Sequence, residues 1–504
     1  MTTPKNAVVV LLDSLNRHML GAYGGAEFAT PNLDRLAARS ARFERHVTGS
    51  LPCMPARHDL LVGAYDFLWR PWGSIELWEQ PITVDLDDAG VTTMLVSDHP
   101  HLFETGGENY HVDFQAWEYE RGHEGDPWKT VPDPSWIGTP TLPARARADR
   151  FYDVSRTYFR AEEDFPGPKV MRTAADWLDR NAGKHDRFFL FVDEFDPHEP
   201  FDTPAPWVNM YDPDWDDELI IWPPYATKAV ERGVITERQA RHIRANYGSK
   251  LSMIDHWLGR ILDTFDAHGL WDDTMLVLCT DHGHYLGERD LFGKPGVMQY
   301  EPLGHIPLLI AWPGMEPKTV DTLTTTVDIH TTLRDMFGAA SPHPTHGFSL
   351  VPLLEGTAAS GREHAIGGVF GNWVQVTDGH RKYARSAVET NFPLSMWSNR
   401  WSTMPTHFRA VGLPKPDRRA YLDFMPHSDV PVIRQPFQPG DLLPFWVSGP
   451  VDRHHLFDLD NDPAEAEELA GTRTVIEKEL TDMLVAALDA VEAPREQSER
   501  LGVG

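Results

Sequence analysis

The sequence has little cysteine, no long hydrophobic run and no excess of positive charge, and each shortage excludes a class of protein. Cys53 and Cys279 are the only cysteines among the 504 residues, so no disulfide framework is indicated and a reducing compartment fits. No stretch reaches the roughly 18 apolar residues that a membrane-spanning helix needs. The apolar run Ala7–Leu12 is too short for the hydrophobic region of a signal peptide. We therefore expect a cytoplasmic protein.

The formal net charge of the chain is -29 at pH 7. Nucleic acids and anionic membrane surfaces are bound through basic faces, so neither is expected as a partner. The hydrophobic and charged fractions, 41% and 24%, are those of a globular protein. A chain of this length predicts two domains, one of them large.

Short apolar runs alternate with helical stretches over the first two thirds of the chain. Five runs have the β-branched and apolar content of strands buried on both faces: Ala7–Leu12, Thr92–Val96, Arg187–Val192, Thr274–Cys279 and Ile306–Ala311. Helical stretches between them are Asn32–Ala41, Lys169–Asn181 and Arg238–Phe265. This alternation predicts an α/β sandwich with a mainly parallel sheet, in which ligands bind beyond the carboxyl ends of the strands.

Changes in composition along the chain indicate domain boundaries. Residues 113–164 are rich in Trp, Pro, Arg and acidic residues without periodicity, which predicts an insertion or a long loop on the larger domain. After Leu353–Gly356 the chain changes to short strand-like pieces, such as Trp373–Thr377 and Arg381–Ala384, and a helix is expected over about Arg473–Val491. We therefore expect a larger domain over 1–360 and a smaller one over 361–504.

Cys53, Pro55 and Arg57 form a Cys-x-Pro-x-Arg motif directly ahead of a short helical stretch. Pro55 is tolerated in a first helical turn, so residue 53 is expected at a helix N-terminus, where free N–H groups favour a bound anion. Arg57, one turn further on, can donate to residue 53 or to an anionic ester. The alternative for the motif alone is a buried structural cysteine. The motif resembles the activation signature of the type I sulfatases, which implies that Cys53 is oxidised to formylglycine.

Polar residues follow two of the predicted strands. Asp13 follows Leu12, while Asp281 and His282 come after the run that ends at Cys279. In the sulfatases the equivalent residues bind one divalent cation, which contacts residue 53, so the resemblance implies that Asp13, Asp281 and His282 are metal ligands. The alternative is a loop carboxylate next to a structural histidine.

The metal expected at these ligands depends on where the sequence departs from the family. Sulfatases commonly have a second aspartate where this sequence has Ser14. The loss of a carboxylate and the presence of His282 shift the expectation from calcium toward manganese, zinc or magnesium. The pair Asp281–His282 resembles the pattern of the phosphonate monoester hydrolases and phosphodiesterases of the same superfamily.

Two further segments resemble sulfatase landmarks that carry catalytic residues. The predicted strand ending at Val192 runs into Pro197–His198, and the resemblance implies that His198 protonates the leaving alcohol or donates to the ester oxygen. Lys294 ends a Leu-x-Gly-Lys stretch and would bind the transferred sulfuryl oxygens.

Directly after the predicted strand that ends at Val96, the sequence departs from a motif of the sulfatase family. Many sulfatases have Gly-Lys-Trp-His there, whereas Ser97–His101 reads Ser-Asp-His-Pro-His. The alignment places His99 where the family has a lysine, and His101 where a base breaks down the covalent intermediate, so both are candidate substrate-binding residues. Alternatively, Asp98 pairs with a cationic group of the substrate and the two histidines bridge it.

Weaker matches extend the resemblance in the expected order: Thr30–Leu36, Ile306–Gly314, Gly347–Leu350 and Leu456–Pro463. The resemblance therefore implies an alkaline-phosphatase-like α/β fold with a smaller C-terminal domain built on an antiparallel sheet and a helix. It implies a sulfuric ester hydrolase that acts on a small-molecule sulfate ester by double displacement. In that reaction hydrated formylglycine attacks sulfur, His198 protonates the departing alcohol, and the sulfated hemiacetal expels sulfate. A formylglycine-generating enzyme is the implied partner during maturation.

Two other functions stay open from the sequence. A phosphonate monoester or phosphodiester hydrolase would use the same residue 53 and is favoured by Asp281–His282. A non-catalytic binding protein would keep the fold but would need no nucleophile. The Trp-rich segments Trp69–Trp72 and Trp397–Trp401 fit a substrate pocket, the core or a subunit interface, and the C-terminal aromatic stretch is compatible with a homo-oligomer.

Overall fold

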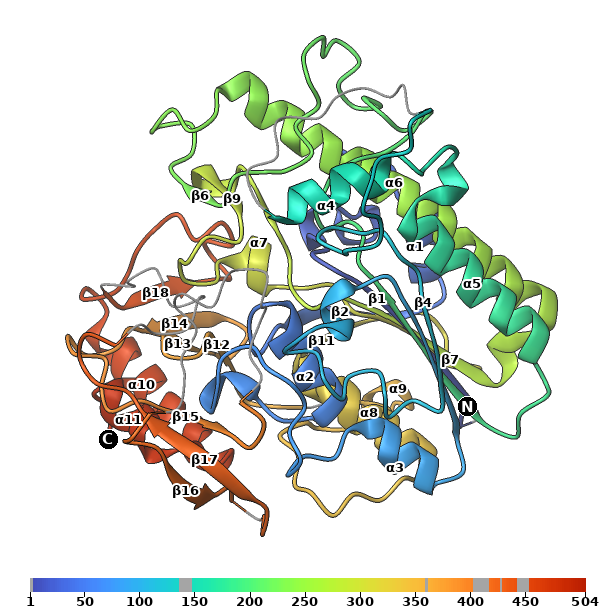
Figure 1. Cartoon of the computed structure of the whole chain (residues 1–504). Helices are drawn as coiled ribbons and strands as arrows, with labels where there is room; N and C mark the ends of the chain where they lie inside the picture. Colours follow the sequence, from blue (N-terminus) through green and yellow to red (C-terminus); the bar gives the residue numbers. More distant parts are fainter. Residues whose placement is uncertain (1–2, 136–146, 359–360, 402–416, 427, 442–452) are drawn as a thin grey trace.

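An eight-stranded sheet crosses the larger part of the molecule (Figure 1). The computed structural model of the chain describes residues 3–135, 147–358, 361–401, 417–426, 428–441 and 453–504. Across the sheet the strands follow the order β11 (Lys318–Thr325), β2 (Ala41–Val47), β10 (Leu309–Ala311), β7 (Thr274–Cys279), β1 (Asn6–Leu12), β5 (Phe188–Glu194), β3 (Thr92–Ser97) and β4 (Ala116–Tyr119).

Neighbouring strands of this sheet are parallel except where they pair with β10, which is antiparallel to both β2 and β7. Successive side chains of a strand point to opposite faces of its sheet. In β1 the side chains of Val8, Val10 and Leu12 therefore enter one hydrophobic core, and those between them enter a second core on the other face. This two-sided burial explains why β1 is a continuous apolar run. The mainly parallel sheet predicted from the sequence is confirmed.

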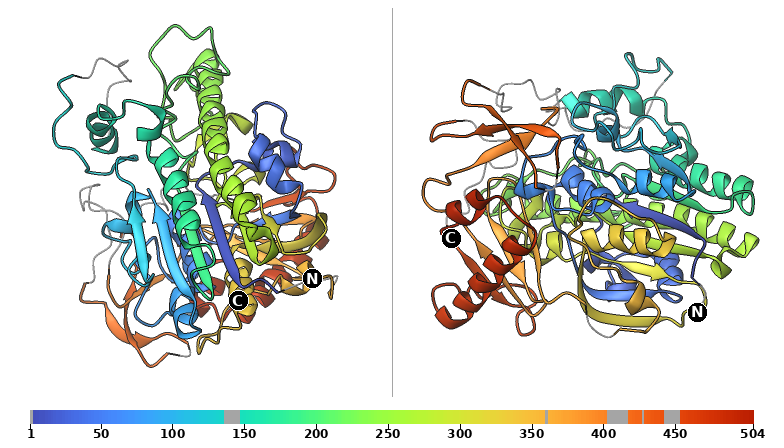
Figure 2. Two further views of the ribbon diagram at one scale, coloured as in Figure 1. Left: turned by 90° about the vertical axis from the view of Figure 1, so that its right-hand side faces the viewer. Right: turned by 90° about the horizontal axis from the view of Figure 1, so that it is seen from below.

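Helices cover both faces of the sheet. The helices α1 (Pro31–Ala37), α5 (Pro166–Asn181) and α6 (Glu237–His268) pack on one face, and α5 and α6 lie side by side (Figure 2). The opposite face is covered by α2 (Cys53–Val62), α3 (Ile82–Asp88), α8 (Thr326–Phe337) and α9 (Val351–Leu354). Thr236 begins α6 by accepting a hydrogen bond from the N–H of Gln239, and Gly269 ends it with a positive φ of 63°.

The C-terminal part of the chain forms two antiparallel sheets at one end of the molecule (Figures 1 and 2). The first contains β12 (Ala365–Gly368), β13 (Val374–Thr377), β14 (Arg381–Arg385) and β18 (His455–Asp458), and α10 (Thr474–Ala490) packs against it. The second contains β15 (Ser395–Ser398), β17 (Pro431–Pro436) and β16 (Tyr421–Phe424), and α11 (Arg495–Arg500) closes the chain. Because the large sheet ends at Thr325 and these sheets begin at Ala365, we propose a domain boundary near residue 360.

Several elements were not predicted from the sequence. The segment 113–164 contains β4 and α4 (Arg147–Arg156), and the side chains of β4 are largely exposed because it is an edge strand. A small sheet of β6 (Ala226–Thr227), β9 (Leu291–Gly293) and β8 (Tyr285–Leu286), together with α7 (Glu301–Gly304), was also missed because these elements are too short to show a period.

The two Trp-rich segments meet in the core of the C-terminal part. The rings of Trp69 and Trp397 pack edge to face with centroids 5.3 Å apart. Part of the aromatic stretch, 402–416 and 442–452, lies outside the described residues. In the described part of the chain, no helix has the length and hydrophobicity to cross a membrane.

Candidate active site

Four sequence-predicted residues meet at the carboxyl edge of the large sheet. Asp13 follows β1 and Asp281 follows β7, and because these strands are parallel neighbours their ends lie at the same edge. Cys53 occupies the first turn of α2, whose ten residues are all buried. Ligand atoms of Asp13, Cys53, Asp281 and His282 all lie within 4.8 Å of one another.

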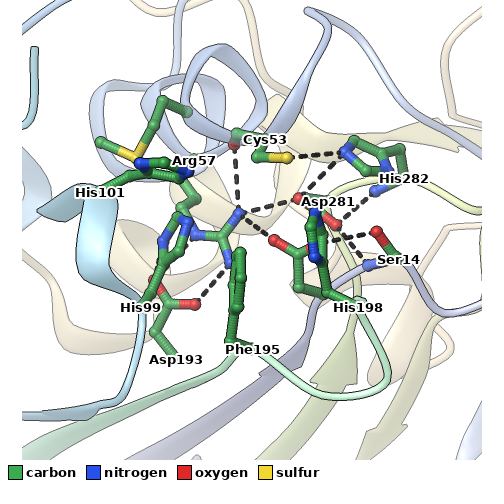
Figure 3. A network of polar contacts seen from close by, with 12 residues as sticks. Ser14, Cys53, Arg57, His99, His101, Asp193, Phe195, His198, Asp281 and His282 are labelled. Atoms are coloured by element: carbon green, nitrogen blue, oxygen red, sulfur yellow. Dashed lines mark hydrogen bonds and ion pairs between the residues drawn. The ribbon is translucent and has the colours of Figure 1, made fainter. Parts of the chain in front are cut away.

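The orientation of His282 suits a metal ligand. Its Nδ1 lies 2.8 Å from the carbonyl oxygen of Gly283 and donates to it, so that Nε2 carries the lone pair. That Nε2 lies 3.2 Å from the Sγ of Cys53 and 3.3 Å from the Oδ2 of Asp281 (Figure 3). The buried Oδ2 of Asp13 has no hydrogen-bond donor among the described residues and faces the ion-pair partner Arg57. Two carboxylates, an imidazole nitrogen and residue 53 therefore fit a divalent cation.

Burial and mutual repulsion set the pKa values in this cluster. Burial, followed by the Asp281 carboxylate, raises the pKa of Asp13 well above its usual range. Burial also acts to raise the pKa of Asp281, but His282 and Arg57 outweigh it and hold that pKa below its ordinary value. Burial and Asp13 raise the pKa of the Cys53 thiol. The buried Asp13 carboxylate is thus short of positive charge, which a cation would supply.

Arg57 is held by carboxylates from three neighbouring strands. Its Nε and Nη2 donate to the two oxygens of Asp193 at 2.8 and 2.7 Å, and its Nη1 lies 2.8 Å from the Oδ2 of Asp281 and 3.0 Å from the Oδ2 of Asp13. The same Nη1 lies 3.3 Å from the carbonyl oxygen of Cys53. All of these carboxylates are fully buried. Arg57 therefore fixes the start of α2 relative to the sheet edge.

Lys294 lies next to Cys53, and His198 lies next to Lys294. The Nζ of Lys294 lies 2.7 Å from the Nε2 of His198, 3.4 Å from the Oγ of Ser14 and 3.7 Å from the Sγ of Cys53. The Nδ1 of His198 donates to the carbonyl oxygen of Glu199 at 2.7 Å. Burial lowers the pKa of His198 to about 3, so its ring is neutral at pH 7 and its Nε2 accepts from Lys294.

The two histidines after β3 occupy different electrostatic surroundings. His99 is fully buried and stacks on Phe195 with centroids 4.4 Å apart, and neither of its ring nitrogens has a hydrogen-bond partner in the described structure. His101 is paired through Nδ1 with Glu104 and through Nε2 with Glu124 at 3.3 Å. Burial alone would lower the pKa of His101, but these two carboxylates raise it to about 10.

Asp98 directly precedes His99 in the chain. Its Oδ1 accepts from the N–H of Phe195 at 2.8 Å, and burial raises its pKa well above the usual range. Asp98, Glu194 and Asp196 are all buried. The Asp196 carboxylate adds to the rise in the pKa of Asp98. The Asp98 carboxylate in turn adds to the rise in the pKa of Glu194.

Sequence reasoning missed two residues that organise the site, Asp193 and Phe195. Asp193 stands at the end of β5, level with Leu11 of β1, and a carboxylate at the end of a buried strand is the signal that could have found it. Phe195 lies between His99 and His198 and stacks on both rings (Figure 3), with centroids 4.4 and 4.2 Å away. A phenylalanine after an apolar run carries no sequence signal for that position.

The fold and the residues at the sheet edge define a hydrolase of the alkaline phosphatase superfamily. A family model described as Sulfatase matches residues 5–339. The chain belongs to the sulfatase family, and as a member it is a sulfuric ester hydrolase.

Individual relatives agree with this assignment. The choline-sulfatase of Rhizobium meliloti (strain 1021) is 27% identical over 427 residues, which are 77% of this chain and 80% of that protein. The multifunctional alkaline phosphatase superfamily protein PehA of Trinickia caryophylli is 26% identical over 419 residues, 70% of this chain and 77% of the relative. The fold is similar to that of the phosphonate monoester hydrolase of Agrobacterium radiobacter, with a TM-score of 0.65, 18% identity and coverage of 97% and 96% of the two chains.

Proposed function

We propose that this protein hydrolyses a small-molecule sulfate ester, with formylglycine formed from Cys53 as the nucleophile and one divalent metal ion beside it. The observation that carries the proposal is the convergence of Asp13, Cys53, Asp281 and His282 within 4.8 Å. Lys294, 3.7 Å from the Sγ of Cys53, adds the positive charge that an anionic ester requires.

Asp13, Asp281, His282 and residue 53 would hold the metal ion. The fit rests on the Oδ2 of Asp13, which has an ion pair with Arg57 but no hydrogen bond among the described residues, and on the lone pair that His282 Nε2 directs at the cluster. Oxygen ligands with one imidazole suit manganese, magnesium or zinc and admit calcium. When bound, the ion would neutralise the ester oxygens and the nucleophile that lie against it. Formylglycine would supply a geminal diol in place of a thiol.

Lys294 and His198 are proposed to handle charge and the proton at the ester. Lys294 would bind a sulfuryl oxygen, since it is buried and lies between Cys53 and His198. When the bond from sulfur to the alcohol oxygen breaks, that oxygen needs a proton. His198 is neutral and its Nε2 accepts from Lys294, so we propose that the Lys294 ammonium gives the departing oxygen its proton and that His198 orients Lys294. Glu199 keeps Nδ1 protonated and thereby fixes the tautomer of the ring.

Arg57, His99 and His101 are proposed to position residue 53 and the substrate. Arg57 is occupied by buried carboxylates, so its role would be to anchor the first turn of α2. The free nitrogens of His99 are available to an ester oxygen. His101 is protonated at neutral pH because of Glu104 and Glu124, and both of its ring nitrogens are paired with these carboxylates, so its role would be to fix the segment after β3 and not to accept a proton.

The direct test combines peptide mass spectrometry with activity. Protein co-expressed with a formylglycine-generating enzyme should show the aldehyde in the tryptic peptide that contains residue 53, and should release sulfate from 4-nitrophenyl sulfate. Cys53→Ala should abolish this activity, whereas Cys279→Ala should retain it, because Cys279 lies in the core and outside the metal-ligand cluster. Full activity with an unconverted thiol at position 53 would remove formylglycine from the proposal.

Metal dependence is tested separately. Dialysis against a chelator should abolish sulfate release, and addition of manganese, magnesium, zinc or calcium in turn should restore it to different extents. Activity that persists in protein shown by elemental analysis to be free of metal would contradict the role given to Asp13, Asp281 and His282.

A second candidate is hydrolysis of phosphonate monoesters or phosphodiesters with the same residue 53. The observation that favours it is the imidazole of His282 in the cluster, and similar proteins include the phosphonate monoester hydrolase and PehA described above. The ratio of kcat/KM for an aryl sulfate to that for the matching aryl phosphodiester decides between the two. A ratio below one would make the sulfate esters the secondary substrates.

The compartment in which the protein works is also a proposal. Both cysteines are free in the structure, which is compatible with a reducing compartment, and we propose that the protein works in the cytoplasm after modification by a formylglycine-generating enzyme. Fractionation of cells followed by immunodetection would locate it.

A further inference from the structure

Lys294, His198, Glu199 and Tyr225 form a closed circle of contacts, which we call the Lys294 cluster. The Nζ of Lys294 lies 2.7 Å from the Nε2 of His198. The Nδ1 of His198 donates to the carbonyl oxygen of Glu199, and the side chain of Glu199 accepts through Oε1 from the hydroxyl of Tyr225. The circle closes at Tyr225, because the Nζ of Lys294 lies over its aromatic ring, 5.8 Å from the centroid.

The backbone sets the position of Tyr225 relative to Lys294. Tyr225 directly precedes β6, which pairs antiparallel with β9 (Figure 1), and β9 ends at Gly293, one residue before Lys294. The register of this pairing, Ala226 with Phe292, places Tyr225 level with Gly293. A Cβ at Gly293 would lie only 2.3 Å from the Cδ1 of Tyr225. Glycine at this position therefore lets the aromatic ring lie directly against the backbone that carries Lys294.

Glu199 anchors the other end of the Tyr225 side chain. Glu199 is 5% exposed, and its Oε2 lies 3.4 Å from the Nδ1 of His198 and 3.3 Å from the Nε2 of His284. Tyr225 itself is 41% exposed, yet its hydroxyl donates to this buried carboxylate. Hydrogen bonds to a charged acceptor are stronger than those between neutral groups. A partly exposed aromatic ring is thus held in one orientation beside Lys294.

The ammonium of Lys294 depends on such neighbours for its position. Within the described structure the contacts of its Nζ are with the Nε2 of His198, the Oγ of Ser14, the Sγ of Cys53 and the ring of Tyr225, and none of these is a carboxylate. A lysine side chain is a flexible four-carbon stem that ends in a point charge. In the absence of an ion pair, the packing of Tyr225 and the hydrogen bond to His198 restrict the stem.

We propose that Tyr225 and Glu199 are positioning residues that hold the Lys294 ammonium against the departing alcohol oxygen. This inference rests on the proposed function, which gives Lys294 the protonation of that oxygen. In that step one N–H bond of the ammonium breaks and one O–H bond forms on the alcohol, while Tyr225 and Glu199 keep the protonation states they have. Tyr225 acts through its ring, and Glu199 acts through Tyr225 and His198.

The first test removes the anchor and keeps the ring. Tyr225→Phe loses the hydrogen bond to Glu199 but retains the aromatic side chain. Protonation matters more for phenol than for 4-nitrophenol, because phenol is the weaker acid and the poorer leaving group. We therefore expect kcat/KM to fall about tenfold for phenyl sulfate and no more than about threefold for 4-nitrophenyl sulfate. A purely structural defect would lower both values by the same factor.

The second test asks whether Glu199 acts through Tyr225. Glu199→Gln should give the same pattern with the two esters, because an amide presents only one acceptor oxygen to the groups around the carboxylate. The double variant Tyr225→Phe/Glu199→Gln should lose about as much as the more affected single variant, since both changes break the same contact. Losses that multiply in the double variant would show that the two residues act independently and would contradict the role given to Glu199.

Tyr158→Phe is the matched control. The hydroxyl of Tyr158 donates to the carbonyl oxygen of Val131 at 3.0 Å, and neither residue belongs to the Lys294 cluster. Removing this hydroxyl should leave kcat/KM unchanged for both esters. Equal losses for the two esters in Tyr225→Phe, or no loss for either, would overturn the inference while the proposed function stands.

Calorimetric titration with inorganic sulfate gives a readout that needs no turnover. Because the Lys294 ammonium is a cation that an oxyanion can contact, sulfate should bind Tyr225→Phe at least about threefold more weakly than it binds the wild type and Tyr158→Phe. If the wild type hydrolyses no sulfate ester but sulfate binding follows this pattern, the proposed function fails and the positioning of Lys294 stands. If no ester is hydrolysed and sulfate binds all three proteins equally, or none of them, both the inference and the proposed function fail.

Discussion

Asp193 pairs with Arg57 through two buried hydrogen bonds of 2.8 and 2.7 Å. Removing one partner of a buried ion pair leaves the other without compensation. Asp193→Asn should therefore lower the free energy of unfolding by about 3 kcal/mol. It should also lower kcat on the order of 10- to 100-fold, because Arg57 would no longer fix residue 53. Urea denaturation and steady-state kinetics measure the two effects.

Asp186→Asn is the control for Asp193→Asn, since Asp186 is exposed just before the same strand. It should change neither the free energy of unfolding nor kcat. A kcat for Asp193→Asn equal to that of the wild type would show that Arg57 needs no anchor beyond Asp13 and Asp281.

His101 should make stability depend on pH. Its pKa is raised to about 10 in the folded protein by Glu104 and Glu124, above about 6.5 in an unfolded chain. A raised pKa contributes stability that is fully present below about pH 6.5 and is lost as the pH rises through about 10. The difference in unfolding free energy between wild type and His101→Gln should therefore shrink over this range, by on the order of 5 kcal/mol. Urea denaturation at a series of pH values measures it, and a constant difference would contradict the assignment.

Single residues also show how far sequence reasoning reaches. Cys53, Asp13, Asp281 and His282 could be proposed as one cluster because each lies at a helix start or a strand end, positions that a sequence pattern can locate, and the structure does bring them together. The burial that lowers the pKa of His198 to about 3 could not be predicted, because it depends on side chains from distant segments.

At the scale of elements, the end of α2 is as constrained as its start. Gly63 ends the helix with φ of 76°, and a Cβ there would lie 2.5 Å from the Nδ1 of His330 on α8. Gly63→Ala combines an unfavourable backbone conformation with this clash, so it should destabilise the protein by about 2–3 kcal/mol. A shift of α2 would also move Cys53, so activity should fall. Thermal denaturation and sulfate release are the measurements.

Gly338 provides the comparison for Gly63, because it ends α8 with φ of 64° but a Cβ there would meet no described heavy atom within 4 Å. Gly338→Ala should cost about 1 kcal/mol, from the backbone alone. Equal losses of stability in Gly63→Ala and Gly338→Ala would mean that α2 and α8 can move apart to accommodate the added Cβ at no cost in free energy.

Which elements could be predicted follows from their burial. Strands β1, β5 and β7 are buried over their whole length and read as continuous apolar runs. The half-buried β2, which is interrupted by charged residues, and the edge strands β4 and β11 have no such run and were missed. Because β1 and β7 carry the site's aspartates at their ends, the predictable elements were also those that position the chemistry.

At the scale of the whole molecule, a buried charge cluster joins the C-terminal sheet to the active site. Lys382 on β14 pairs with Glu301 on α7 at 2.8 Å and with Glu465. In α7, the carbonyl oxygen of Leu303 accepts from the N–H of Gly283, next to His282. The C-terminal part is thereby connected to a proposed metal ligand through one lysine, two carboxylates and a short helix.

Breaking this cluster should therefore affect both stability and activity. Lys382→Met would leave Glu301 and Glu465 buried without a cation and should lower the unfolding free energy by about 3–5 kcal/mol. Arg381→Met, one residue earlier on β14, removes ion pairs to the more exposed Asp378 and Glu479 and should cost no more than about 1 kcal/mol. Urea denaturation followed by sulfate release below the transition measures both. If Lys382→Met unfolds like Arg381→Met and keeps full activity, the C-terminal sheet and the catalytic edge are energetically independent, and the connection through α7 is structural contact alone.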